Sequence, residues 1–344
     1  MNYVCYYMLS FKSIVYIMLD VNYGFILRYL HTNGASLFML LIYFHLYRGL
    51  CYNSYCRSLY LWITGLMLLL LSILESFLGY ILPFGQMSYW AVIVILGFVS
   101  VIPLIGHMLS IYFLCSYTQI LNHIIGLHFI VGYVLLLIVI LHIVILHSIC
   151  SINSIFSSIF IFNSSTWSCY FIYFWPLIIM KDFSLTMCWV LILSCIFIVN
   201  ASLFGNCDNS IPAYVLITPI HIIPEWYFLI FYSFIRSFPN KSLGILVLFF
   251  IIFNCFGLKN EKSFSSFQFI PINDMFMTGY QKCRFITMIH FYRTFYSIEG
   301  SLFIFLTFYL FIFGAWKAED YYLSIQRISL FAFLSTFSNI FFLL

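Results

Sequence analysis

The sequence predicts an all-α membrane protein, a bundle of transmembrane helices. Of its 344 residues, 64% are hydrophobic and only 7% are charged, and the mean hydropathy is +1.08. So few charges could not cover the surface of a soluble domain. The apolar residues form runs close to the length of about 20 residues that crosses a hydrocarbon core as a helix. Because backbone polar groups in lipid must be satisfied within the segment, these runs indicate spanning helices.

Seven apolar runs predict seven spans. Their approximate limits are 29–47, 61–82, 124–147, 183–204, 243–258, 300–316 and 322–343. The piece from Met87 to Cys115 is broken at Pro103, which favours short helices packed against the bundle over another crossing. The Ser-rich stretch 148–170 and the basic stretch 258–296 are expected to be loops. The net charge of +4 is small and spread along the chain, so nothing indicates a nucleic-acid partner.

Four histidines form two pairs with the same spacing. His31 and His45 lie 14 residues apart in one apolar run, and His128 and His142 lie 14 apart in another. On an α-helix, this separation leaves two side chains within about 40° of each other and about 21 Å apart along the axis. Two such helices side by side would present an upper and a lower pair of imidazoles, which suits the axial ligation of haem iron. The spacing therefore predicts two stacked b-type haems. The alternative, that these are hydrogen-bonded histidines of the core, would be favoured for a single histidine but not for two pairs with the same spacing.

Other residues recur at positions that suit two haems. Arg28 lies three residues before the first histidine and Arg48 three after the second, where each guanidinium could pair with a propionate or simply extend to the membrane surface. Gly65 and Gly79 are again 14 residues apart, in the second run. A glycine inside a helix costs about 1 kcal/mol relative to alanine. The repeated interval favours close approach of a flat macrocycle over packing between helices.

The eleven cysteines are scattered without metal-site spacing, so they predict neither a disulfide framework nor a zinc site. The first 19 residues lack a basic region and a small-residue cleavage site, so no cleavable signal peptide is expected. Glu75 places a charge in the middle of the second predicted span, and the sequence assigns it no role.

Four segments resemble cytochrome b of the mitochondrial quinol–cytochrome c reductase. They are RYLHTNGAS (28–36), YFHLYRGL (43–50), GYILPFGQMSYW (79–90) and, most specifically, PEWY (224–227). The similarity extends from about Phe11 to the C-terminus and is strongest between residues 20 and 241. The photosynthetic counterpart is a poorer match, because it is divided into two polypeptides and has one more residue between the second pair of histidines.

The resemblance implies a haem-bearing subunit that oxidises quinol at one membrane face and passes electrons through two non-covalently bound haems to quinone at the other, coupled to proton translocation. Each haem would have two histidines, one arginine and one glycine beside it: His31, His128, Arg28 and Gly79 for the low-potential haem near the intermembrane side, and His45, His142, Arg48 and Gly65 for the high-potential haem near the matrix side.

The resemblance also implies two pockets for quinones. The quinol-oxidation pocket would contain Glu225, Tyr80, Ala91, Tyr227 and Tyr232, and the quinone-reduction pocket His147, Lys181 and Asp182. Glu225 is the expected proton acceptor, since a carboxylate at membrane depth is costly unless it is functional; the alternative is a structural carboxylate bonded to backbone. Ala91 stands where the family has a glycine, which puts a methyl group in the pocket wall.

The implied setting is a homodimeric complex in the mitochondrial inner membrane, with a Rieske-type iron–sulfur subunit, a cytochrome c1-type subunit, other subunits, membrane lipid, and ubiquinone as substrate. Residues 1–204 would form the di-haem core, 205–242 the loop of the quinol pocket, and 243–344 the C-terminal transmembrane helices. Family members have eight spans. Because residues 10–24 align just before the second family helix, the first is expected to be missing, which leaves seven.

Two other classes of protein stay open. A di-haem membrane anchor of a dehydrogenase would also show paired histidines, but it would lack PEWY. A transporter or channel would account for the hydrophobicity and for Glu75, yet it would leave the repeated 14-residue interval unexplained. A reduced-minus-oxidised spectrum that shows two b-type haems would eliminate the last class.

Overall fold

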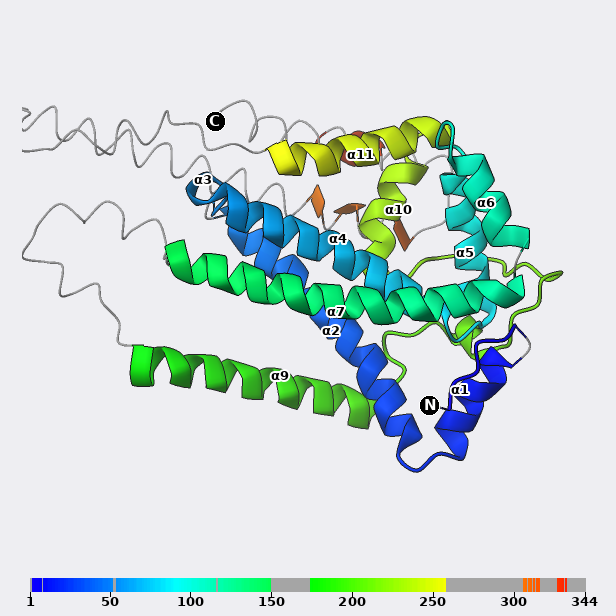
Figure 1. The fold of residues 1–344 in the computed structure, drawn as a ribbon, viewed down its shortest axis with the longest axis horizontal. Helices are drawn as coiled ribbons and strands as arrows, with labels where there is room; N and C mark the ends of the chain where they lie inside the picture. Colours follow the sequence, from blue (N-terminus) through cyan, green and yellow to red (C-terminus); the bar gives the residue numbers. More distant parts are fainter. Residues whose placement is uncertain are drawn as a thin grey trace, which may run out of the picture.

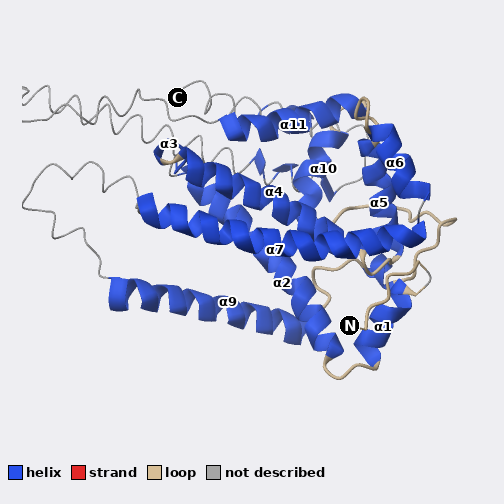
Figure 2. Ribbon diagram, in the orientation of Figure 1, coloured by secondary structure: helices blue, strands red, loops and turns tan. Residues whose placement is uncertain are grey.

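The chain is described by a computed structural model that covers residues 2–7, 9–51, 54–115, 117–149 and 174–257, together with residues 306, 307, 309, 310, 312, 314, 315, 327–330 and 332. These residues form helices and loops, and no strand occurs among them (Figure 1 and Figure 2). The all-α fold class predicted from the sequence is therefore confirmed.

The helices are α1 (Ser10–Leu19), α2 (Gly24–Cys51), α3 (Ser54–Arg57), α4 (Leu59–Ile81), α5 (Gln86–Val99), α6 (Gly106–Cys115), α7 (Tyr117–Ile149), α9 (Ile179–Asn200), α10 (Leu229–Arg236) and α11 (Lys241–Gly257). Short turns of other helix types precede α9 (η2, Phe174–Ile178) and α10 (η4, Trp226–Phe228), and another, η3, covers Cys207–Ser210.

Within the described residues, four helices have the length and composition of membrane spans. They cover Gly24–Leu50, Leu59–Ile81, Leu121–Ser148 and Trp175–Asn200, which correspond to the first four predicted spans. The fifth predicted span falls on α11, which has only 17 residues. The last two predicted spans and the basic loop lie largely outside the described residues, as does most of the Ser-rich loop. The protein is a multi-pass membrane protein.

The spanning helices form an elongated bundle. Helix α7 packs along α4, and α2 contacts both α4 and α9. Helices α5, α6 and α10 gather near one end, and α11 runs from that end back along α4; the C-terminus of α7 and the N-terminus of α9 lie at the other end (Figure 1). The prediction of two short helices on either side of Pro103 is confirmed by α5 and α6.

Local sequence explains where α4 and α11 begin and where α4 ends. The Ser58 hydroxyl accepts a hydrogen bond from the Leu61 amide at 3.3 Å, and the Asn240 side chain accepts one from the Ser242 amide at 3.0 Å. Both are N-cap interactions that satisfy an amide at the open end of a helix. Helix α4 ends just before Pro83, whose ring cannot continue the helix.

The loop that leads to PEWY is fixed to the start of α5 by Gln86, which is 6% exposed. Its Nε2 donates to the carbonyl of Ile217 at 2.5 Å, and its Oε1 accepts from the amide of Tyr214 at 2.7 Å. The Gln86 amide itself donates to the carbonyl of Ile211 at 2.9 Å. These contacts hold two segments more than 120 residues apart in sequence, and so set the position of the candidate site.

One short helix, α1, lies outside every predicted span. Its Ser10 and Ser13 are buried, and the Ser13 hydroxyl donates to the Ser10 carbonyl at 2.7 Å. Tyr3, in the segment before α1, donates from its hydroxyl to the carbonyl of Leu82 at 2.6 Å. The Tyr3 hydrogen bond attaches the N-terminal segment to the turn that follows α4.

Candidate functional site

The four histidines meet in two pairs between α2 and α7. The ring centres of His31 and His128 are 6.3 Å apart, and those of His45 and His142 are 6.4 Å apart. In both pairs the rings are inclined at a large angle, 63° and 77°. The repeated interval along each helix therefore becomes two matched imidazole pairs at two levels of the bundle.

The separation within each pair suits an iron atom between the rings. A metal–nitrogen bond measures about 2.0–2.1 Å, and an imidazole nitrogen lies roughly 1.1–1.2 Å from its ring centre. Two such ligands on opposite sides of one metal place the ring centres about 6.2–6.6 Å apart. The observed 6.3 and 6.4 Å fall in this range, and two imidazoles are a common axial pair for haem. The donor sets fit two haems.

The two predicted glycines lie beside these pairs, on α4. A Cβ atom on Gly79 would lie 2.8 Å from Cε1 of His128, so the imidazole could not keep its place. A Cβ atom on Gly65 would lie 3.4 Å from Cε1 of His142, which is ordinary contact. A side chain on α4 is thus excluded beside the His128 ring and accommodated beside the His142 ring.

Two further residues of α4 contact the histidines, and the sequence reasoning missed this role for both. The Thr64 Oγ1 atom lies 2.9 Å from Nδ1 of His142. The Glu75 Oε1 atom lies 2.9 Å from Nδ1 of His128. A signal was present, because Glu75 precedes Gly79 by one helical turn and therefore shares its face.

The two arginines lie toward opposite ends of α2. Arg28 is half-buried in the second turn, three residues before His31. Arg48 is exposed in the last turn, three residues after His45. Each guanidinium is thus close along the helix to one imidazole pair, at the end of the helix where a carboxylate of a bound group could be paired.

A separate cavity of about 120 Å³ opens among α4, α5 and the PEWY segment. It contains four of the five residues predicted for the quinol pocket, Tyr80, Ala91, Glu225 and Tyr232, and its other walls are almost entirely apolar: Phe77, Val94, Ile95, Phe98, Ile222, Pro224, Phe228, Phe231 and Ile235. An apolar crevice with a few polar groups is typical of a small-molecule site.

Glu225 contributes the carboxyl group in this cavity. Burial raises the pKa of its carboxyl group to about 7, while the neighbouring Tyr80 hydroxyl, as a hydrogen-bond donor, acts in the opposite direction on that pKa. A carboxyl group with a pKa near neutrality can take up and release a proton under ordinary conditions. The cavity therefore combines apolar walls with one group able to exchange a proton.

Tyr227, the fifth predicted residue, does not line the cavity. Its side chain is buried, and the burial raises the pKa of its phenol well above the usual range. Its carbonyl oxygen accepts a 2.5 Å hydrogen bond from the Tyr43 hydroxyl on α2. Tyr227 thus connects the PEWY segment to the helix that carries His45.

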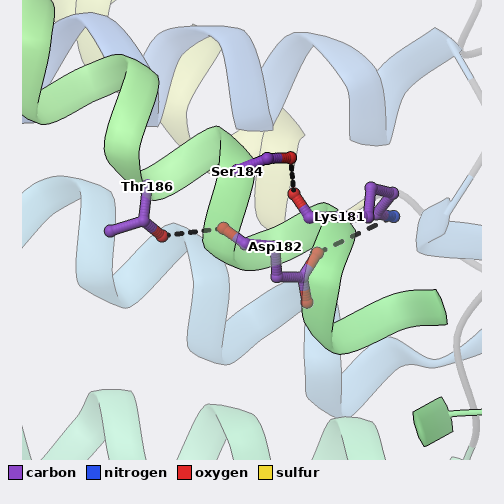
Figure 3. A network of polar contacts seen from close by, with 4 residues as sticks. All are labelled: Lys181, Asp182, Ser184 and Thr186. Atoms are coloured by element: carbon purple, nitrogen blue, oxygen red, sulfur yellow. Dashed lines mark hydrogen bonds and ion pairs between the residues drawn. The ribbon is translucent and has the colours of Figure 1, made fainter. Parts of the chain in front are cut away.

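Of the residues predicted for the second pocket, Lys181 and Asp182 contact each other, and no contact of either with His147 is found within the described residues. His147 is exposed near the C-terminus of α7, and no described cavity contains it. Lys181 and Asp182 are exposed in the first turn of α9 and form an ion pair of 3.8 Å (Figure 3). The C-terminus of α7 and the N-terminus of α9 lie at the same end of the bundle (Figure 1).

Figure 3 also shows that the first turn of α9 bonds mainly to itself. Ser184 donates to the carbonyl of Lys181 and Thr186 to that of Asp182, each at 2.8 Å. These are local contacts within one helix. They leave both charged side chains extended from the helix surface.

Comparison with known proteins indicates a family for this chain. Residues 1–150 match the family model described as cytochrome b/b6/petB, and residues 212–290 match the model for the C-terminal part of cytochrome b/b6/petD. A solved structure of a hyperthermophilic respiratory Complex III is similar in fold, with a TM-score of 0.78 and 23% identity, over 98% of this chain and 84% of that one.

Curated relatives show closer sequence similarity. Cytochrome b of Acanthamoeba castellanii is 41% identical over 246 residues, which are 70% of this chain and 61% of the relative. That of Chondrus crispus is 37% identical over 72% of this chain and 64% of the relative. That of Mycena viridimarginata is 37% identical over 84% of this chain and 74% of the relative. The chain thus spans less than two thirds of the length of the first two.

Proposed function

The chain belongs to the cytochrome b family, and from this premise we propose that it is the haem-bearing subunit of a quinol–cytochrome c reductase of the mitochondrial inner membrane. The observation that carries the proposal is the convergence of both histidine pairs on ring separations of 6.3 and 6.4 Å, each beside a glycine of α4. A mitochondrial location is supported by relatives from an amoeba, a red alga and a fungus.

The residues that hold the two haems are the histidine pairs. His31 and His128 would ligate one iron and His45 and His142 the other, with the porphyrin not covalently attached to the chain. Arg28 and Arg48 pair with propionate groups at the two ends of α2. When bound, each haem supplies a centre that gains and loses one electron at a time.

Quinol binds in the cavity that contains Glu225. The aromatic and aliphatic walls hold the ring and exclude water, and the Tyr80 hydroxyl faces the carboxyl group. Glu225 accepts a proton from the quinol hydroxyl as the quinol is oxidised, because its carboxylate form is the base within the cavity. The cavity borders α4 next to Gly79, at the level of the His31 and His128 pair.

Quinone is reduced at the opposite end of the bundle, near His147, Lys181 and Asp182. These three residues can supply protons to a reduced quinone, and they lie toward the end of α7 that carries His142. Oxidation at one face and reduction at the other would release protons on one side and take them up on the other.

This subunit works with partners. A Rieske-type iron–sulfur subunit would take one electron from quinol, and a cytochrome c1-type subunit would pass it on to cytochrome c. We expect the complex to be a homodimer, as proposed from the family resemblance.

Ubiquinol-dependent reduction of cytochrome c tests the proposal. The complex is isolated through this chain, and the rate is measured with and without an inhibitor that fills the Glu225 cavity. We expect inhibitor-sensitive reduction of cytochrome c. If the preparation instead reduced quinone with electrons from a dehydrogenase substrate and left cytochrome c oxidised, the chain would be a dehydrogenase anchor.

A further inference from the structure

We propose that Glu75 is a positioning residue for His128 and that it lowers the reduction potential of the haem held between His31 and His128. The inference rests on the proposed haem-binding function. Its starting point is the 2.9 Å contact between Glu75 Oε1 and His128 Nδ1, at the interface between α4 and α7.

Glu75 and His128 face each other in a buried setting. Nδ1 of His128 is buried and has no hydrogen-bond partner within the described residues, and the Glu75 carboxyl group lies 2.9 Å from it as an ion-pair contact. The second oxygen, Oε2, is also buried and has no hydrogen-bond partner within the described part of the chain. The two side chains are only 20% and 21% exposed, so the carboxyl group lies in the helix interface.

Space for the carboxyl group comes from Gly132. This glycine follows His128 by one turn of α7, and a Cβ atom there would lie 3.3 Å from Glu75 Oε1, which is tighter than ordinary contact. A carboxyl group inside a membrane span is costly and marks a functional position by default. Glu75, His128 and Gly132 therefore form one local arrangement between two helices.

The second histidine pair has a different partner at the corresponding nitrogen. Thr64 Oγ1 lies 2.9 Å from Nδ1 of His142, and it also lies 3.0 Å from each of two backbone carbonyls of its own helix. A hydroxyl group has one proton. If a carbonyl receives that proton, Thr64 accepts the Nδ1–H of His142, which leaves Nε2 of that ring free for a metal.

The two pairs thus differ in the charge of the acceptor. A carboxylate that accepts the Nδ1–H of a metal-bound histidine fixes the ring and raises its basicity. A more basic axial ligand stabilises ferric over ferrous iron, so the one-electron ferric/ferrous couple moves to a lower potential. A neutral hydroxyl that accepts the same N–H raises the basicity of the ring less and so lowers the potential less, because hydrogen bonds to charged groups are roughly twice as strong as neutral ones.

Redox titration of the assembled complex tests the inference, with the two b-type haems followed by their optical bands. Glu75→Gln keeps an acceptor oxygen and removes the charge. At a fixed ambient potential, we expect about a tenfold higher ratio of reduced to oxidised haem at the His31 and His128 pair. For a one-electron couple, this ratio corresponds to a rise of about 59 mV in the reduction potential of that haem. The haem at the other pair should keep its potential.

Thr64→Val is the matched variant at the other pair, and it should shift only the haem held by His45 and His142. Gly132→Ala covers the case in which Glu75→Gln does not assemble, because it keeps the carboxyl group but displaces it from His128. We expect it to raise the potential of the same haem, and to change the ferric electron paramagnetic resonance signal of that haem alone.

The outcomes separate the two levels of the proposal. A wild-type complex without two b-type haems would contradict the proposed function itself. Two haems in the wild type, with both potentials unchanged in Glu75→Gln and in Gly132→Ala, would overturn the role of Glu75 and leave the proposed function standing. Equal shifts of both haems would also overturn it.

Discussion

The Tyr43 hydroxyl donates a 2.5 Å hydrogen bond to the carbonyl oxygen of Tyr227. Tyr43 lies on α2 two residues before His45, and Tyr227 belongs to the same four-residue segment as Glu225. The bond is long-range, joining residues 184 positions apart. It therefore links the helix that carries two of the histidines to the segment that carries the proton acceptor.

Tyr43→Phe should slow quinol oxidation without removing a haem. The change deletes one neutral hydrogen bond, worth about 0.5–1.5 kcal/mol, and frees the segment that positions Glu225. We expect turnover to fall by roughly 2- to 10-fold. Steady-state kinetics measure the turnover, and the haem content of the same preparation shows whether both haems are retained. Unchanged turnover with loss of a haem would show that Tyr43 supports α2 alone.

Glu225 should give quinol oxidation a pH dependence. The pKa of its carboxyl group is raised to about 7, so the group is mainly protonated below that pH and cannot accept a proton. The rate should therefore rise as the pH increases through 7 and level off above it. In Glu225→Gln we expect the rate to fall by about 10²–10⁴-fold and this rise to disappear.

The matched control for Glu225 is Asp208→Asn, which removes a carboxylate from the exposed turn η3. It should keep the wild-type pH profile. Tyr80→Phe adds a second arm, because loss of the hydroxyl removes a hydrogen bond that lowers the pKa of Glu225. The profile should move to higher pH. Full turnover of Glu225→Gln at every pH would leave only a structural role for this residue.

The two α4 glycines should respond differently to alanine. Gly79→Ala places a Cβ 2.8 Å from the His128 ring, whereas Gly65→Ala places one at 3.4 Å from the His142 ring. Overpacking costs about 1–3 kcal/mol, which is roughly a 5- to 150-fold loss of affinity. We expect Gly79→Ala to lose the haem of its pair and Gly65→Ala to keep both haems.

Gly126→Ala on α7 is the control for the glycine variants, since a Cβ there meets no described atom within 4 Å. Haem content per chain and the two reduction potentials distinguish the three variants. Equal haem loss from Gly65→Ala and Gly79→Ala would contradict the close approach at one pair only.

Ala91 should weaken the binding of inhibitors that fit closely against the wall of the Glu225 cavity. It lines that cavity, and the family resemblance implies a glycine at its position in other members. A methoxyacrylate-type inhibitor should bind about 5- to 150-fold more tightly to Ala91→Gly, because one methyl group leaves a packed site. The KM for quinol should change little. If inhibitor sensitivity stayed the same, neighbouring side chains would already accommodate the methyl group.

The spacing of the histidines could be read from the sequence because one period, 14 residues, brings two side chains to one face of any α-helix. The spans could be read because lipid imposes their length and composition. Partners across helices could not be read in the same way. Which acceptor faces His128 or His142 depends on the rotation of α4 against α7, and a spacing on one helix does not determine it.

The two quinone pockets show the same limit. Four residues of the Glu225 cavity come together because Gln86 fixes a distant loop to α5, and this contact has no local sequence signal. For His147, Lys181 and Asp182, the chain between α7 and α9 lies mostly outside the described residues. The second pocket therefore stays a prediction.

The most direct test of the account is the number of b-type haems per chain in the purified complex, measured as extracted pyridine haemochrome. The account predicts two in the wild type and one in His142→Ala, since the two pairs are separate sites. His123→Ala, an exposed histidine of the same helix, should keep two. Fewer than two haems in the wild type, or loss of both from a folded His142→Ala complex, would contradict the account.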